Sequence, residues 1–188
     1  VLLEPQQYVF SQYLQRLYER DENVELVNAA LGKKDGVLPL YKIGFSDARW
    51  ATGLASFRKD VVEKAFTTGH VQRQAIKEGV QVPVDSDRRI VSEDIPVISV
   101  KTLMHRYDIT KIDLLQIDTE GFDYEVIKMF DLQNDPPRVI IYENMHLSES
   151  DRKSCRAYLR EHGYSIRIMH ANTLAMRDPY GDLQPFFA

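Results

Sequence analysis

The stretch that decides the fold of this chain is Ile112-Asp113-Leu114-Leu115-Gln116-Ile117-Asp118-Thr119-Glu120-Gly121. Its first six residues give the clearest strand pattern in the sequence, so we expect a buried strand over residues 112–117. Two acids, Asp118 and Glu120, come directly after it, and Gly121 permits a tight turn before a helix over residues 124–130. A buried strand that turns sharply into a helix is typical of an α/β sheet.

Strands and helices alternate on both sides of this stretch. The other expected strands are residues 1–3, 24–30, 37–42, 97–100 and 138–142, and Pro39 indicates that 37–42 is an edge strand. The other expected helices are residues 6–19, 56–66, 101–107 and 148–162, and residues 69–77 suit a helix or a loop. Residues 164–169 and 173–177 predict a closing hairpin. The fold class is therefore α/β, with a mostly parallel sheet that ends in an antiparallel hairpin.

Composition excludes several classes of protein. The 188 residues suit one domain, and 44% apolar with 28% charged residues is ordinary globular usage. A net charge of −4 gives no basic footprint for nucleic acid. No apolar run approaches the roughly 20 residues of a membrane span, and no signal peptide is visible. We therefore expect a cytoplasmic protein with no nucleic-acid or membrane partner. Its single cysteine, Cys155, is either a packed core thiol, which we favour, or a thiol made acidic by its basic flanks.

Polar residues stand at the carboxyl ends of the expected strands, where open α/β sheets bind their ligands. Glu4 comes directly after the first strand. Its carboxylate could accept two hydrogen bonds from the vicinal hydroxyls of a ribose, or it could be a solvated loop acid beside the next helix. The second strand ends at Asn28, Ala29 and Ala30. Residues 118–121 follow the clearest strand, and residues 143–146 follow the strand at 138–142.

The acids after the clearest strand are the most informative candidates. Burying an unpaired charge is costly, so Asp118 and Glu120 should meet a cation such as a sulfonium, an amino group or a metal, or else cap the following helix. Glu143 and His146 could converge with Asp118 on a substrate hydroxyl, although His146 could equally be structural. The spacing of these residues matches no compact metal-ligand motif, so we expect no metal site.

Several segments, in order along the chain, resemble the FkbM-type methyltransferase family. Residues 112–123 are similar to its "DLLKIDVEGAE" motif, and Leu3-Glu4-Pro5 is similar to its "FEP". Residues 28–41 resemble its "NxALGxxxGxxxLY" stretch through Asn28-Ala29-Ala30-Leu31-Gly32, Asp35-Gly36 and Leu40-Tyr41. Its last parallel strand and closing hairpin are matched by residues 141–147, 163–164 and 172–175. The similarity is spread over nearly the whole chain.

The resemblance implies a Rossmann-like class I methyltransferase fold, in which the last strand of a seven-stranded sheet is antiparallel and inserted beside its neighbour. It also implies methyl transfer from S-adenosylmethionine to a hydroxyl of a small acceptor, often a sugar or a polyketide-like product. By position, Glu4 would bind the cofactor ribose, residues 28–30 would border the adenine, and Asp118 would lie near the methionine part. The candidates for orienting or deprotonating the acceptor are Glu120, Glu143 and His146.

The chain also departs from the family pattern. The family's first strand and glycine-rich loop have no counterpart, because the chain opens at Val1 inside an apolar run. We therefore expect one methyltransferase domain over residues 1–188, incomplete at its N-terminus, with an insertion or lid at about 43–95. Trp50 belongs either to a mobile part of that lid or to its packing. Two other functions stay open: a non-catalytic binding module that keeps the fold, and an NAD-dependent oxidoreductase in which Glu4 also holds a ribose.

Overall fold

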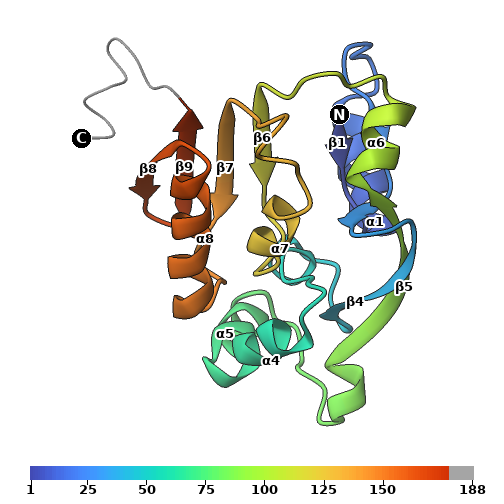
Figure 1. The fold of residues 1–188 in the computed structure, drawn as a ribbon. Coiled ribbons are helices and arrows are strands. Elements are labelled where there is room, and N and C mark those ends of the chain that lie inside the picture. The colour runs from blue at the N-terminus through green and yellow to red at the C-terminus, as the bar shows by residue number, and fades with distance from the viewer. Residues whose placement is uncertain (178–188) are drawn as a thin grey trace. The chain divides into compact units, whose positions relative to one another are not determined.

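The computed structural model describes residues 1–177. The chain divides into two compact units, Val1–Asp108 and Ile109–Ala188, and each is described by itself. Both units contain helices and strands, which confirms an α/β architecture (Figure 1). The expectation of one mostly parallel sheet is wrong for the described residues, because their strands form three sheets with as many antiparallel as parallel pairs. No helix in this part of the chain is long and apolar enough to cross a membrane.

The first unit opens with a parallel pair of short strands, β1 (Leu2–Leu3) and β2 (Leu26–Val27). A continuous helical run joins them, made of α1 (Gln7–Val9), the π-helical turn η1 (Phe10–Leu14) and α2 (Gln15–Leu17). The helix expected over residues 6–19 is thus present, but only Phe10 of its expected apolar face is buried. A π turn changes the angular spacing of side chains, so a 3.6-residue pattern does not continue through it.

The strand expected over residues 24–30 is divided between two sheets. Asn28 ends the pairing of β2, and the chain continues as β3 (Ala30–Gly32). A second sheet has the order β3-β5-β4, in which β4 (Gly36–Ile43) is an edge strand, as Pro39 predicts. Its partner β5 (Ile90–Ser99) is much longer than the predicted piece, because it pairs with β4 over eight residues. The helix α6 (Val100–Arg106) follows directly.

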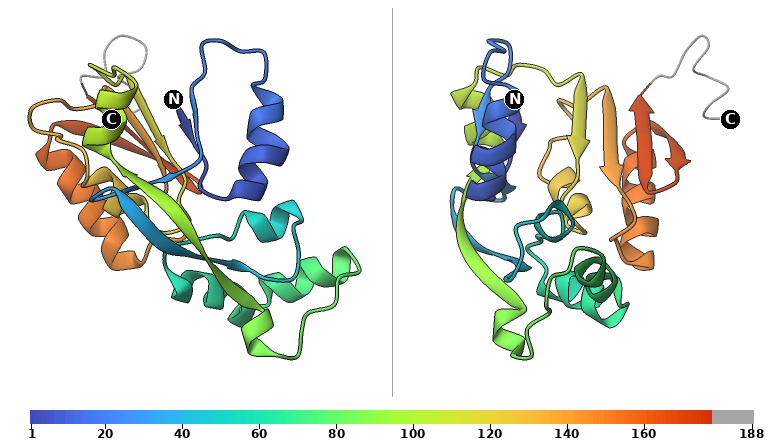
Figure 2. Two further views of the ribbon diagram at one scale, coloured as in Figure 1. Left: turned by 90° about the vertical axis from the view of Figure 1, so that its right-hand side faces the viewer. Right: turned by 180° about the vertical axis from the view of Figure 1, so that it is seen from behind.

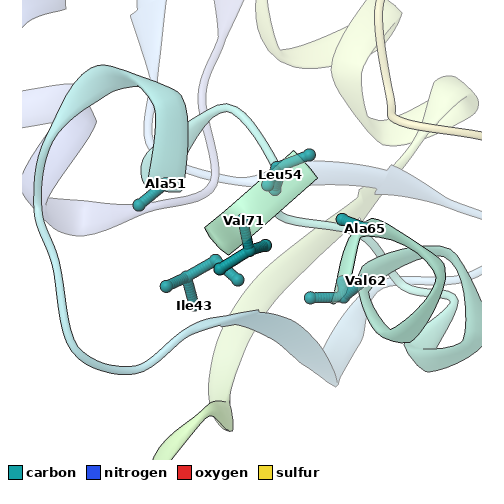
Figure 3. Packing of buried hydrophobic residues seen from close by; sticks show 6 residues of the cluster. All are labelled: Ile43, Ala51, Leu54, Val62, Ala65 and Val71. Carbon is teal, nitrogen blue, oxygen red and sulfur yellow. The ribbon is translucent and has the colours of Figure 1, made fainter. Parts of the chain in front are cut away.

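Residues between β4 and β5 form a helical cap with a core of its own. It contains α3 (Arg49–Thr52), α4 (Lys59–Thr67), α5 (His70–Lys77) and the 3-10 turn η2 (Ser86–Arg88). Figure 2 shows these helices gathered at the end of the long β4–β5 ribbon. Their packed side chains appear in Figure 3: Ile43, Ala51, Leu54, Val62, Ala65 and Val71. Trp50 packs against this cluster and donates a hydrogen bond from Nε1 to Glu78 Oε2 at 3.1 Å, so it is part of the packing.

The second unit is a four-stranded sheet of order β6-β7-β9-β8. β6 (Leu114–Ile117) and β7 (Val139–Glu143) are parallel, and β9 (Asn172–Arg177) lies antiparallel between β7 and β8 (Tyr164–Met169). The insertion of the last strand beside its neighbour, which the family resemblance implies, is therefore observed. The helix α7 (Asp123–Ile127) follows β6, and α8 (Glu149–Glu161) lies against one face of the sheet (Figures 1 and 2).

The core of this unit lies between α8 and the sheet. Cys155 and Leu159 of α8 are fully buried, as are Ile140 of β7 and Ala175 of β9. Burial raises the pKa of the Cys155 thiol to about 12, which answers the open question about this residue in favour of a packed core thiol.

Candidate functional site

The carboxyl ends of β6 and β7 bring two polar segments of the second unit together. These strands are parallel neighbours with Ile117 opposite Tyr142, so residues 118–121 and 143–146 leave the sheet side by side. His146 Nε2 lies 3.2 Å from Glu120 Oε2 and 3.9 Å from Glu143 Oε1. We call Glu120, Glu143 and His146 the carboxylate–histidine cluster. Asp118 lies beside it as an exposed residue at the start of the loop.

The loop after β6 has an unusual backbone conformation. Glu120 has φ 49° and Gly121 has φ 90°, so two consecutive residues adopt positive φ. For a residue with a side chain, a left-handed conformation costs on the order of 1–2 kcal/mol. This turn directs the Glu120 carboxylate toward His146. The sequence predicts the turn at Gly121, but it gives no sign that Glu120 shares it.

The segment after β7 is fixed by the hairpin strand next to it. Asn144 is buried, and its backbone N–H donates to Ala171 O at 2.8 Å. Its side-chain Nδ2 donates to Thr173 Oγ1 at 2.9 Å, and Thr173 is fully buried in β9. Sequence reasoning assigned Asn144 no role, because its partners come from residues about 30 positions further along. These bonds fix the backbone between Glu143 and His146.

Asp123 is a second residue that sequence reasoning missed. This first residue of α7 is fully buried. Its Oδ2 accepts a hydrogen bond from Thr119 Oγ1 at 3.1 Å, and its Oδ1 accepts one from the Glu143 backbone N–H at 3.2 Å. The only sequence signal is its place at the end of the motif that begins at Ile112. Asp123 therefore joins the loop after β6 to the end of β7.

The acids of this site hold their protons far more tightly than free carboxyls do. Burial, followed by the charges of Glu143, Asp118 and Asp123, raises the pKa of Glu120 to about 8. Burial and the charges of Asp118 and Asp123 raise the pKa of Glu143 to about 7. Burial raises the pKa of Asp123 to about 6. Glu143 Oε2 is buried with no hydrogen-bond partner among the described residues. The site therefore favours a proton or another positive charge.

The carboxylate–histidine cluster offers one nitrogen and two carboxylate oxygens within 4.8 Å of one another. Such a set has the donor types and spacing of a divalent-cation site. A sequence pattern could not indicate this, because the three donors come from two separate segments. The 3.2 Å contact between Glu120 Oε2 and His146 Nε2 is equally that of an ion pair, which forms when the imidazole is protonated.

In the first unit, Glu4 and Asn28 stand at the carboxyl ends of the parallel strands β1 and β2. Glu4 Oε1 accepts a hydrogen bond from the Gln6 backbone N–H at 2.8 Å, and burial raises the pKa of Glu4. Asn28 Nδ2 donates to Glu4 O at 2.8 Å and to Pro5 O at 3.2 Å. The side chain of Asn28 therefore fixes the backbone that carries Glu4.

A cavity of about 350 Å³ lies next to these strand ends, within the first unit. Asn28 and Ala29 line it, together with Asp35, Val97, Arg106 and Tyr107. Its volume is at the lower end of the range of small-ligand pockets. Ala30 does not line it, because this residue packs with Leu40 and Ile95 in the core of the second sheet. Of residues 28–30, the first two thus line the cavity and the third packs in the core.

Comparison with known proteins identifies the family of this chain. A family model described as the methyltransferase FkbM domain matches residues 1–166. That range contains every site residue predicted from the sequence, from Glu4 to His146. No curated protein and no solved structure matches the chain significantly.

Proposed function

The chain belongs to the FkbM methyltransferase domain family, and from that premise we propose that it methylates a hydroxyl group of a sugar or another small natural-product acceptor. The enzyme is an S-adenosylmethionine-dependent methyltransferase. One observation carries the choice of a hydroxyl: the 3.2 Å pair of Glu120 and His146 beside the buried carboxyl of Glu143. A hydroxyl is a weak nucleophile and benefits from a base within hydrogen-bond reach, and this pair is suited to that task.

S-adenosylmethionine supplies the methyl group and leaves as its thioether. The acceptor oxygen bonds to the methyl carbon while the carbon–sulfur bond breaks, and the electron pair of that bond stays on sulfur. The hydroxyl proton passes to the Glu120–His146 pair. Either residue can be the first to accept it, since Glu120 Oε2 and His146 Nε2 lie 3.2 Å apart. Glu143 orients the acceptor beside this pair, since its Oε1 lies 3.9 Å from His146 Nε2.

Roles in donor binding are proposed by position in the family, for each unit by itself. In the second unit, Asp118 contacts the methionine part, and its carboxylate suits a positively charged group. In the first unit, Glu4 binds the ribose hydroxyls, and Asn28 and Ala29 border the adenine. The residues present fit these roles, since the Glu4 carboxylate is held in one orientation by Gln6 and the adjacent cavity is of ligand size. Ala30, the next residue along the chain, packs in the core of the second sheet.

Loss of the Glu4 carboxylate is expected to weaken cofactor binding. Glu4→Ala should raise the Kd of S-adenosylhomocysteine by about 10- to 100-fold, because two hydrogen bonds to a charged group are lost. Glu4→Gln, which keeps an oxygen for the Gln6 N–H, should have a smaller effect. Calorimetry on the full chain measures both. Glu22→Ala, at an exposed acid of the same unit, is the matched control and should bind as the wild type does. An unchanged Kd in folded Glu4→Ala would remove Glu4 from the site.

The acceptor class is tested directly with methyl-labelled S-adenosylmethionine. The full chain is incubated with a panel of sugars and natural-product alcohols, each beside its O-methylated or deoxy analogue. We expect label in an ether-linked methyl group for at least one hydroxyl, and none in the matched analogue. Label only at amine nitrogens or carboxyl groups would overturn the choice of a hydroxyl. The same reactions with a chelator should proceed at an unchanged rate. A strict need for added divalent ion would instead show that the cluster holds a metal.

A further inference from the structure

Asp123 presents a problem that the fold alone does not explain. A fully buried carboxylate is costly unless its charge is compensated, and the described contacts of Asp123 are two neutral hydrogen-bond donors. An asparagine could replace both bonds without a charge, because its oxygen can accept from the Glu143 N–H and its NH₂ group can donate to Thr119 Oγ1. The carboxylate does not serve as the cap of α7 either, since the N-cap residue is Phe122 and it makes no side-chain capping bond. The negative charge at this position therefore calls for another reason.

The two hydrogen bonds of Asp123 connect the segments that carry the base. The bond to Thr119 closes the loop in which Glu120 and Gly121 adopt positive φ. The bond to the Glu143 N–H ties that loop to the last residue of β7, three residues before His146. Glu120 and His146 come from these two segments, so the 3.2 Å contact between them depends on how the segments are held together.

We propose that Asp123 is a positioning residue for methyl transfer, which holds the Glu120 loop against the end of β7 and keeps a negative charge behind the carboxylate–histidine cluster. The inference rests on the proposed function, because it assigns Asp123 to the residues that form the base. Asp123 itself does not touch the substrate. It is buried, and its two hydrogen bonds hold Thr119 and the backbone of Glu143 together.

The charge of Asp123 also tunes the base. It is one of the charges that raise the pKa of Glu120 and of Glu143, together with that of Asp118. From the opposite side, Cys155 of α8 faces Asp123, and His146 faces both glutamates. Asp123 has a pKa of about 6, so it is ionised at the pH near 8 where Glu120 titrates. A neutral residue at position 123 should therefore make Glu120 a weaker base that loses its proton at lower pH.

The test separates the charge of Asp123 from its two bonds. Asp123→Asn keeps the shape, an oxygen for the Glu143 N–H and a polar group for Thr119. We expect the midpoint of the pH dependence of single-turnover methyl transfer to move down by at least about half a unit. The plateau rate at high pH should fall about 3- to 10-fold, because a weaker base accepts the proton less readily. The Kd of S-adenosylhomocysteine should be unchanged.

Thr119→Val is the matched control for structure. It removes one of the two bonds and leaves the charge, so it should lower the rate without moving the midpoint. A folded Asp123→Asn variant with the wild-type midpoint and the wild-type plateau rate would overturn the role given to Asp123, while the proposed methyl transfer to a hydroxyl would stand. A wild type whose rate does not rise near pH 8 would overturn the base itself and this inference with it. Circular dichroism and thermal unfolding verify that each variant is folded.

Discussion

Replacing Glu120 with Gln is expected to slow single-turnover methyl transfer by about 10²- to 10⁴-fold, the usual contribution of a general base. Gln keeps the size of the side chain and an oxygen that can accept a hydrogen bond from His146, so the cluster should retain its shape. It removes the oxygen that can take up a proton. His146→Ala should have a loss of similar size, because the two residues lie 3.2 Å apart and act together as the base in the proposed step.

The rate of methyl transfer is expected to depend on pH. Burial raises the pKa of Glu120 to about 8, so the carboxyl is protonated at lower pH and cannot accept the hydroxyl proton. The wild-type rate should therefore rise with pH through about 8, and the Glu120→Gln variant should lack that rise. Glu161→Gln, at an exposed acid of α8, is the matched control and should behave as wild type. Rates that stay unchanged in alanine variants of Asp118, Glu120 and His146 would eliminate the cluster as the catalytic site.

The same substitution is expected to stabilise the fold at alkaline pH. Glu120 has a higher pKa in the folded chain than in the unfolded one, so the native state binds its proton more tightly. This contribution to stability is fully present below the unfolded pKa of 4.5 and is lost as pH rises toward about 8. Above pH 8 the wild type contains a buried carboxylate that Glu120→Gln lacks. We expect the variant to be more stable there by about 2 kcal/mol, well below the roughly 5 kcal/mol that the whole pKa difference would give.

Urea unfolding at pH 5 and at pH 9 measures this difference. At pH 5 the two free energies of unfolding should nearly agree, since Glu120 is protonated in the native state of the wild type. At pH 9 the variant should have the higher midpoint with an unchanged slope. The control Glu161→Gln should follow the wild type at both values. A variant that is less stable than the wild type at pH 9 would mean that the Glu120 charge is compensated in the fold. Activity and stability are expected to change in opposite directions, as is common at functional sites.

The sequence predicts those elements whose determinants are local. The helix over residues 148–162 is one, because Ser148 accepts a hydrogen bond from the Asp151 N–H at 3.0 Å and Gly163 ends the helix with φ 82°. The closing hairpin is another. The gathering of Glu120 with Glu143 and His146 follows from the parallel pairing of two well-marked strands. The burial predicted for the strand over residues 112–117 is wrong, since β6 is largely exposed and Leu114 has 55% of its surface accessible.

Features that depend on distant partners were not predictable from the sequence. The full length of β5 is set by its pairing with β4, and Ile43 and Ile90 meet although 46 residues separate them. The division of the expected sheet follows from Asn28, whose side chain bonds to the Glu4 and Pro5 carbonyls and so ends the pairing of β2. Asp123 was missed for the same reason, because its partner on β7 lies 20 residues away in sequence.

The meeting of Ile43 with Ile90 has a consequence for how this enzyme can diversify. The chain leaves the second sheet at Ile43 and returns at its direct neighbour Ile90, and within the cap Ser56 forms one further bridge with Tyr41 of β4. Its core is a cluster separate from that of Ala30, Leu40 and Ile95. Extending or shortening such a segment adds little closure entropy and leaves the register of the sheet intact. We therefore expect the part of the cap beyond the Ser56 bridge to tolerate changes in length while the sheet keeps its architecture.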